Sequence, residues 1–86
     1  MNTLKVSNKT VVKSLAGAIV NEVKNSDEVA ICAVGASAVN QMVKGIATAR
    51  SFAVVDGFDI TCIPAFDTTE IDGETKSCIV VTVTKK

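Results

Sequence analysis

The stretch 32–52, CAVGASAVNQMVKGIATARSF, decides how the rest of the chain is interpreted. Its first residues continue an apolar run that begins at Val29, which predicts a strand buried on both faces. Gly35 ends this run, and Ser37 is expected to cap a helix that follows. Apolar residues then recur every three or four positions, which predicts an amphipathic helix. Its core-facing stripe comprises Val39, Met42, Val43, Ile46 and Ala49, and a second stripe of small residues comprises Ala38, Gly45 and Ala49.

The connection from strand to helix has two interpretations. The first amides of a helix attract anions, so the turn at Gly35 is suited to a phosphate group. Asn40 and Gln41 follow within two turns and can hydrogen-bond to phosphates or bases, and Lys44 adds positive charge. The other interpretation is a plain capped helix with a solvated polar face. The G-x-x-x-x-G-K-[ST] pattern of nucleotide-hydrolysing loops is absent, which argues against a hydrolase.

The segments around this stretch complete a two-layer α+β domain that spans residues 1–86. Residues 3–7 and 77–84 alternate between apolar and polar positions, which predicts half-buried strands. Residues 8–25 change to the period of a helix, and Ser7 or Thr10 is expected to cap it. With the strand at 58–66, the order is β-α-β-α-β-β. Right-handed crossovers then predict a four-stranded mixed sheet with two helices on one face.

The second half of the chain contains two features with surface roles. Pro64 cannot donate a ladder hydrogen bond, so its strand is expected to be an edge strand, or to bulge or end there. Residues 67–76 are predicted to form an acidic connection with a turn at Asp72 and Gly73. The face of the sheet away from the helices is expected to be wet or part of an interface. It should carry Thr3, Lys5, Thr61, Thr82 and Thr84.

Composition argues against catalysis. The 86 residues include no histidine, so neither a Ser-His nor a Cys-His nucleophile pair can form within one chain. The chain has three cysteines, Cys32, Cys62 and Cys78, which is an odd number, and none of them forms a C-x-x-C motif. Reduced, buried thiols are therefore expected rather than a zinc site or a catalytic thiol. No metal or cofactor is predicted. No apolar run reaches the roughly 20 residues of a membrane span, and no signal peptide is recognised, so a cytoplasmic location is expected.

Five stretches together resemble the stage V sporulation protein S family of bacteria, almost from end to end. They are LKVS (4–7), SLAGAI (14–19), VGASAVNQMVKGIATAR (34–50), CIPAF (62–66) and IDGE (71–74). The combination of N-Q-x-V-K with C-I-P-A-F is the specific part. The family is similar in fold to Alba, the archaeal chromatin protein, and such folds usually dimerise. The resemblance implies a role in sporulation, or a regulatory role in bacteria that do not sporulate, with nucleic acid as the partner of a homo-oligomer.

The resemblance to Alba also implies where nucleic acid would bind. Alba proteins use lysines after the first strand, the start of the second helix, and a basic hairpin between the last two strands. The first two places correspond here to Lys9, Gly35, Ser37, Asn40, Gln41, Lys44 and Arg50. The third does not correspond, because residues 67–76 carry four acids and one lysine, and negative charge repels a duplex.

A protein–protein adaptor is the alternative function. In that case the acidic segment from Asp67 to Glu74, or the threonine-rich face of the sheet, would contact a protein partner, and nucleic acid would not be bound. The neutral net charge and the acidic segment 67–74 motivate this alternative. The net charge is zero, with an excess of three positive charges in residues 1–50 and of three negative charges in residues 51–86. The residues leave open the choice between dimer and tetramer and between DNA and RNA.

Overall fold

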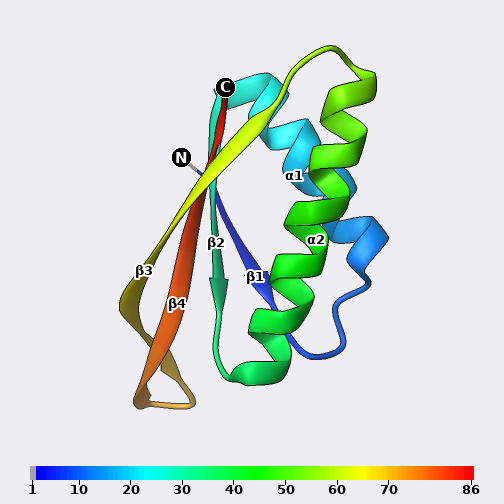
Figure 1. The fold of residues 1–86 in the computed structure, drawn as a ribbon. Coiled ribbons are helices and arrows are strands. Elements are labelled where there is room, and N and C mark those ends of the chain that lie inside the picture. Colours follow the sequence, from blue (N-terminus) through cyan, green and yellow to red (C-terminus); the bar gives the residue numbers. More distant parts are fainter. Residues whose placement is uncertain (1) are drawn as a thin grey trace.

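Two helices cover one face of a four-stranded mixed sheet in the computed structural model, which describes residues 2–86 (Figure 1). The elements in chain order are β1 (Thr3–Val6), α1 (Val12–Ser26), β2 (Glu28–Ala33), α2 (Ala36–Val55), β3 (Ile60–Ile71) and β4 (Glu74–Lys85). The strands lie in the order β1-β2-β4-β3, with β1 parallel to β2 and the other neighbours antiparallel. The predicted α+β architecture, β-α-β-α-β-β, is therefore confirmed.

The central strand β2 is the best buried element of the sheet. Ala30 lies between Thr3 of β1 and Thr82 of β4. The neighbouring positions Val29 and Ile31 point toward the helices and are fully buried. Since β2 has a strand on each side and helices over one face, its continuous apolar run has the partners that such a run requires.

The small-residue stripe of α2 packs against α1, which confirms the importance of that stripe. Gly45 lies against Leu15 so closely that a Cβ atom added there would stand 2.8 Å from Leu15 Cγ. The other buried positions of α2 are Ala38, Met42, Ala49 and Ala53. Val43 was predicted to face the core and is instead 56% exposed, because the contact between the helices turns α2 toward its small residues.

The predicted helix caps were wrong. Neither helix has a side-chain hydrogen bond at its N-cap, which is Val11 for α1 and Gly35 for α2. Thr10 Oγ1 accepts instead from the amide of Ser7, inside the loop before α1. Ser37 lies in the first turn of α2, because Gly35 adopts a φ of 87° and the helix begins immediately after it.

The acidic segment 67–76 forms a hairpin, as predicted, but most of its residues continue the two strands instead of forming a connection between them. Its turn is at Asp72 and Gly73 as expected, and both adopt positive φ angles, typical of a two-residue hairpin turn. Residues 67–71 pair with residues 74–78. Strand β2 does not pair with this part of β4, because the last paired residues of β2 and β4 are Ala33 and Ile79. We call residues 67–78 the hairpin tip. In Figure 1 it projects past the end of β2.

Strand β3 pairs with β4 alone, so it forms one edge of the sheet, as Pro64 predicted. Apart from Ile60 and Thr69, every residue of β3 is exposed, including Phe66 at 85%. The register also confirms the composition of the face away from the helices. Thr61 and Thr84 are paired on that face, whereas the neighbouring Val83 points to the other face and is buried.

Candidate nucleic-acid interface

The start of α2 presents backbone amides without side-chain caps. The first bond of the helix runs from the amide of Val39 to the carbonyl of Gly35, 3.0 Å away. The amides of Ala36, Ser37 and Ala38 precede this bond and have no carbonyl within the helix to pair with. In a helix of 20 residues, these amides form the positive end of the macrodipole. The geometry therefore suits an anion.

A cleft of about 450 Å³ opens beside these amides. Its walls come from the carboxyl ends of β1 and β2, the residues that follow each of these strands, the first turn of α2, and the hairpin tip. The lining residues are Lys5, Val6, Ser7, Asn8, Cys32, Val34, Gly35, Ala36, Ser37, Ala38, Thr69, Glu70 and Ile71. The volume falls within the range of small-molecule sites, and the lining combines an apolar base with few charged groups.

The loop between β1 and α1 is fixed against α2 by a single side chain. Gln41 Nε2 donates to the carbonyl of Thr10 over 2.9 Å. This bond occupies the amide that the sequence assigned to nucleic acid, and it gives Gln41 a structural role at this point. It also places Lys9 and Lys13, which flank Thr10, next to the helix that carries Lys44.

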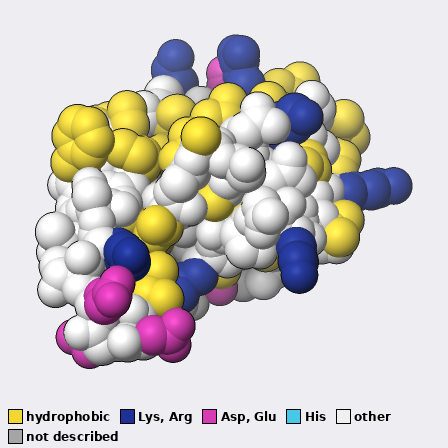
Figure 2. Space-filling view, turned by 90° about the horizontal axis from the view of Figure 1, so that it is seen from below, with side chains coloured by type: hydrophobic (Ala, Val, Ile, Leu, Met, Phe, Trp, Pro, Cys, Tyr) yellow, Lys and Arg dark blue, Asp and Glu magenta, His cyan; other side chains and the backbone are white. Residues whose placement is uncertain are grey.

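Within residues 2–86, four lysines around this end of the molecule have no acidic partner in an ion pair. The ion pairs within residues 2–86 involve Lys24, Arg50 and Lys76, but not Lys5, Lys9, Lys13 or Lys44. Figure 2 views this end and shows several basic side chains spread over it, while acidic side chains gather at one side. The four lysines are exposed, so their charges are available to a ligand in solution.

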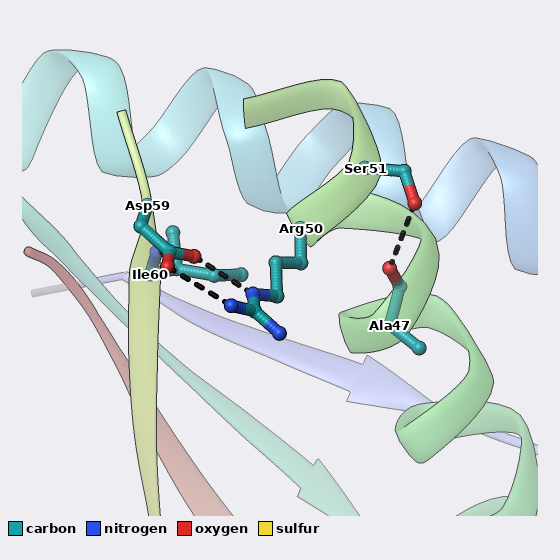
Figure 3. Close-up of polar contacts among 5 residues, drawn as sticks. All are labelled: Ala47, Arg50, Ser51, Asp59 and Ile60. Carbon is teal, nitrogen blue, oxygen red and sulfur yellow. Dashed lines mark hydrogen bonds and ion pairs between the residues drawn. The ribbon is translucent and has the colours of Figure 1, made fainter. Parts of the chain in front are cut away.

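Arg50 lies at the other end of α2 and is engaged within the protein. Its Nε and Nη2 donate to the two carboxylate oxygens of Asp59 over 2.9 and 3.1 Å (Figure 3). Thirteen residues separate Arg50 from Ser37, which corresponds to about 20 Å along the helix. The hydrogen bond from Arg50, together with one from the amide of Ile60, lowers the pKa of Asp59 to about 2. The hydrogen bond and the charge of Asp59 raise the pKa of Arg50.

This pair should make the stability of the fold depend on acid. The pKa of Asp59 is depressed from an ordinary 3.8, so the ionised carboxylate stabilises the folded state above about pH 4, and this stabilisation is lost as the pH falls toward about 2. Urea unfolding followed by circular dichroism should therefore show a wild type more stable than Asp59→Asn at neutral pH, with the difference shrinking in acid. A difference that stays constant between about pH 6 and pH 2 would contradict this assignment.

The cysteines differ from one another in environment. All three are free, as the sequence predicted, but only Cys78 is buried; Cys32 is half-buried and Cys62 is exposed. The expectation of three buried thiols was therefore wrong for Cys62, which lies on the uncovered edge strand. Burial raises the pKa of the Cys78 thiol, with smaller contributions from Cys32 and Asp67. No three side chains of the described chain form a metal-binding group.

The cleft brings together only part of the predicted site. Gly35 and Ser37 line it, whereas Lys9, Asn40 and Lys44 lie outside it. The other lining residues were not among the predicted nucleic-acid-binding residues, and they include Lys5, Asn8 and Glu70. Lys5 lies on the open face of the sheet, as predicted, and next to the last residue of β1. Its place near the end of a strand parallel to β2 was a usable signal, because the carboxyl ends of parallel strands meet at one edge of a sheet.

The arrangement described above, two helices on one face of a β1-β2-β4-β3 sheet, defines the Alba-like class of folds. The solved structure titled "Alba from Thermoplasma volcanium" is similar, with a TM-score of 0.60 and 15% sequence identity over 99% of each chain. That likeness concerns the fold. The sequence profile of Stage V sporulation protein S (SpoVS) matches residues 2–86, so the chain belongs to that family, and membership implies a role in sporulation. Neither helix within residues 2–86 has the length and hydropathy of a membrane-spanning segment.

Proposed function

We propose that this protein is a sporulation or developmental regulator that binds nucleic acid as a homodimer and has no enzymatic activity. The observation that carries the proposal is the group of four unpaired lysines around the uncapped start of α2. Phosphate groups are recognised by lysines and by helix N-termini together, and both are present on this end of the molecule. The proposed contacts are Lys9, the first turn of α2 at Gly35 and Ser37, Asn40 and Lys44.

Exposed apolar side chains support the homodimer. Val43 on α2 is 56% exposed and Phe66 on β3 is 85% exposed. Phe66 lies on the same face of the sheet as the helices, because it pairs with Ile79, which packs against the core. Because α1 and α2 leave β3 uncovered, an apolar surface remains beside α2. Surfaces of this kind are typical of interfaces between subunits. A dimer across it would add a second copy of the lysine-bearing end.

The role of Lys44 can be tested with fluorescence anisotropy on labelled duplex DNA, single-stranded DNA and single-stranded RNA. Lys44→Glu should weaken binding about tenfold and reduce the slope of log affinity against log salt by about 1, because one phosphate contact is lost. Lys9→Glu should act in the same direction with a smaller effect. Lys86→Glu is the matched control, since it changes the net charge equally at the far end of β4. Equal affinities for Lys44→Glu and Lys86→Glu would reject this site.

The protein–protein adaptor is retained as a second candidate because of the hairpin tip. It exposes Asp67, Glu70 and Asp72, none of which has an ion-pair partner within residues 2–86. A basic protein partner would satisfy these charges. If the wild type binds none of the three nucleic acids at low salt, and reversal of the tip acids to lysine abolishes binding to a basic partner, the adaptor function is favoured.

A further inference from the structure

The hairpin tip is attached to the rest of the sheet by one end only. Its two strands pair with each other, and among residues 2–86 no third strand lies beside them, because the pairing of β2 with β4 stops at Ile79. Cys78, where the tip begins, is buried, and no other tip residue is. A two-stranded ribbon without a hydrophobic face is only marginally stable by itself. The tip is therefore the part of the sheet that can move at the lowest energetic cost.

One acid of this tip, Glu70, lines the same cleft as the first turn of α2. Thr69 and Ile71 of the tip line this cleft together with Glu70, and Lys5 lines it as well. Among the four tip acids, Glu74 is paired with Lys76 at 3.1 Å, whereas Glu70 has no ion-pair partner in the described part of the chain. The helix end and Lys5 favour an anion in this cleft, so the negative charge of Glu70 on its lining opposes the binding of a phosphate there.

We propose that the hairpin tip is an electrostatic gate: Glu70 shields the cleft in the unbound protein, and the tip moves away when an anionic ligand takes its place. The inference rests on the proposed nucleic-acid site at the start of α2. It explains why an end with four unpaired lysines coexists with an acidic arm. The acidic arm does not embrace a duplex. It lowers the affinity of the site for weakly bound anions and leaves the site to ligands that bind several lysines at once.

The gate predicts that removing one particular negative charge strengthens binding. Glu70→Gln should bind single-stranded DNA or RNA about fivefold more tightly than the wild type, because the competing carboxylate is lost. Asp27→Asn is the control. Asp27 is exposed at the opposite end of the sheet, its φ of 66° is one that asparagine tolerates, and the change in net charge is the same. This control should change affinity less than about twofold, since its charge is distant and screened.

A second variant removes the gate without relying on one side chain. Thr68 pairs with Ser77, so replacing residues 69–76 by Asn-Gly leaves a register that a two-residue turn can close. The removed residues lie outside the core, so the fold should persist, which circular dichroism checks. The shortened protein should bind nucleic acid at least as tightly as Glu70→Gln. In titrations with inorganic phosphate, its amide NMR signals from Ala36 to Ala38 should shift at lower concentrations than those of the wild type.

The outcomes separate the gate from the site on which it depends. Tighter binding by Glu70→Gln and the shortened protein, with Asp27→Asn unchanged, supports the gate. Equal affinities for the wild type, Glu70→Gln and Asp27→Asn would overturn the gate and leave the nucleic-acid site intact. Absence of nucleic-acid and phosphate binding in every variant would overturn both. Binding by the two gate variants alone would support both, with the gate closed in the wild type.

Discussion

Replacing Gly45 by valine is expected to destabilise the fold by about 2 kcal/mol. The new Cβ would stand 2.8 Å from Leu15 Cγ and even closer to Leu15 Cδ2, and Leu15 is itself buried at 6% exposure. Leu15 therefore cannot move into solvent without uncovering the contact between α1 and α2. Helix propensity offsets only a few tenths of a kcal/mol of this cost, because valine is a modest helix former. Urea unfolding followed by circular dichroism would measure the loss.

Gly17 supplies the matched control for that experiment. It lies on the exposed side of α1, and nothing stands within 4 Å of a Cβ atom added there. Gly17→Val should consequently leave the free energy of unfolding within about 0.5 kcal/mol of the wild type. In addition, Leu15→Ala should reduce the cost of Gly45→Val when both are present, because it removes the clashing atoms. Equal destabilisation by Gly45→Val with and without Leu15→Ala would show that the clash is not the cause.

Replacing Ile31 by alanine is expected to cost about 3 to 4 kcal/mol, the larger of the two effects. Ile31 is fully buried in the central strand, between Leu4 of β1 and Val81 of β4, with the helices above it. Strands on both sides hold the backbone, so the cavity cannot collapse, and the cost combines lost transfer energy with the cavity itself. For a domain of this size such a loss is a large part of the total stability.

The same substitution on the edge strand tests whether burial is the reason. Ile63 is 73% exposed on β3, so Ile63→Ala should change the free energy of unfolding by less than about 0.5 kcal/mol. Chemical denaturation of the two variants under identical conditions is a direct comparison, because the atoms removed are the same. A loss at Ile63 as large as that at Ile31 would mean that the edge strand is covered in solution, and the oligomeric state should then be measured by analytical ultracentrifugation.

The architecture could be predicted from sequence because its signals are local. The apolar run at Val29 and the change of period after Thr10 each identify an element within a few residues. The hairpin tip could not be predicted in the same way. Its residues are polar on both faces, since no helix covers them, so neither alternation nor an apolar run marks them as strands. The threonines among the acids, such as Thr68 and Thr75, were the only signal for a strand.

The candidate site depends on contacts that sequence does not contain. Asn40, Gln41 and Lys44 were recognised as a polar stripe, but the bond from Gln41 to the Thr10 carbonyl joins residues 31 positions apart. The cleft depends on how far the hairpin tip extends past β2, which is a property of three strands together. The cap at Gly35 was assigned to Ser37 because serine is the commoner cap, whereas the positive φ of glycine let the helix start earlier.

The uncovered edge of β3 has a consequence for the protein at high concentration. A strand of twelve residues whose outer edge is unpaired is a template on which further strands of other molecules can add, and this is how many sheet proteins aggregate. Pro64 stands near the middle of β3 and has no amide hydrogen to offer to an added strand, and Asp67 and Glu70 repel a second copy of themselves. With valine in place of Pro64, the segment 60–66 would carry no charge and no proline and would be apolar at every position except Thr61, which is the pattern of a segment that aggregates. Pro64 therefore keeps the edge of β3 available to a partner while blocking the repeated addition of strands that leads to aggregation.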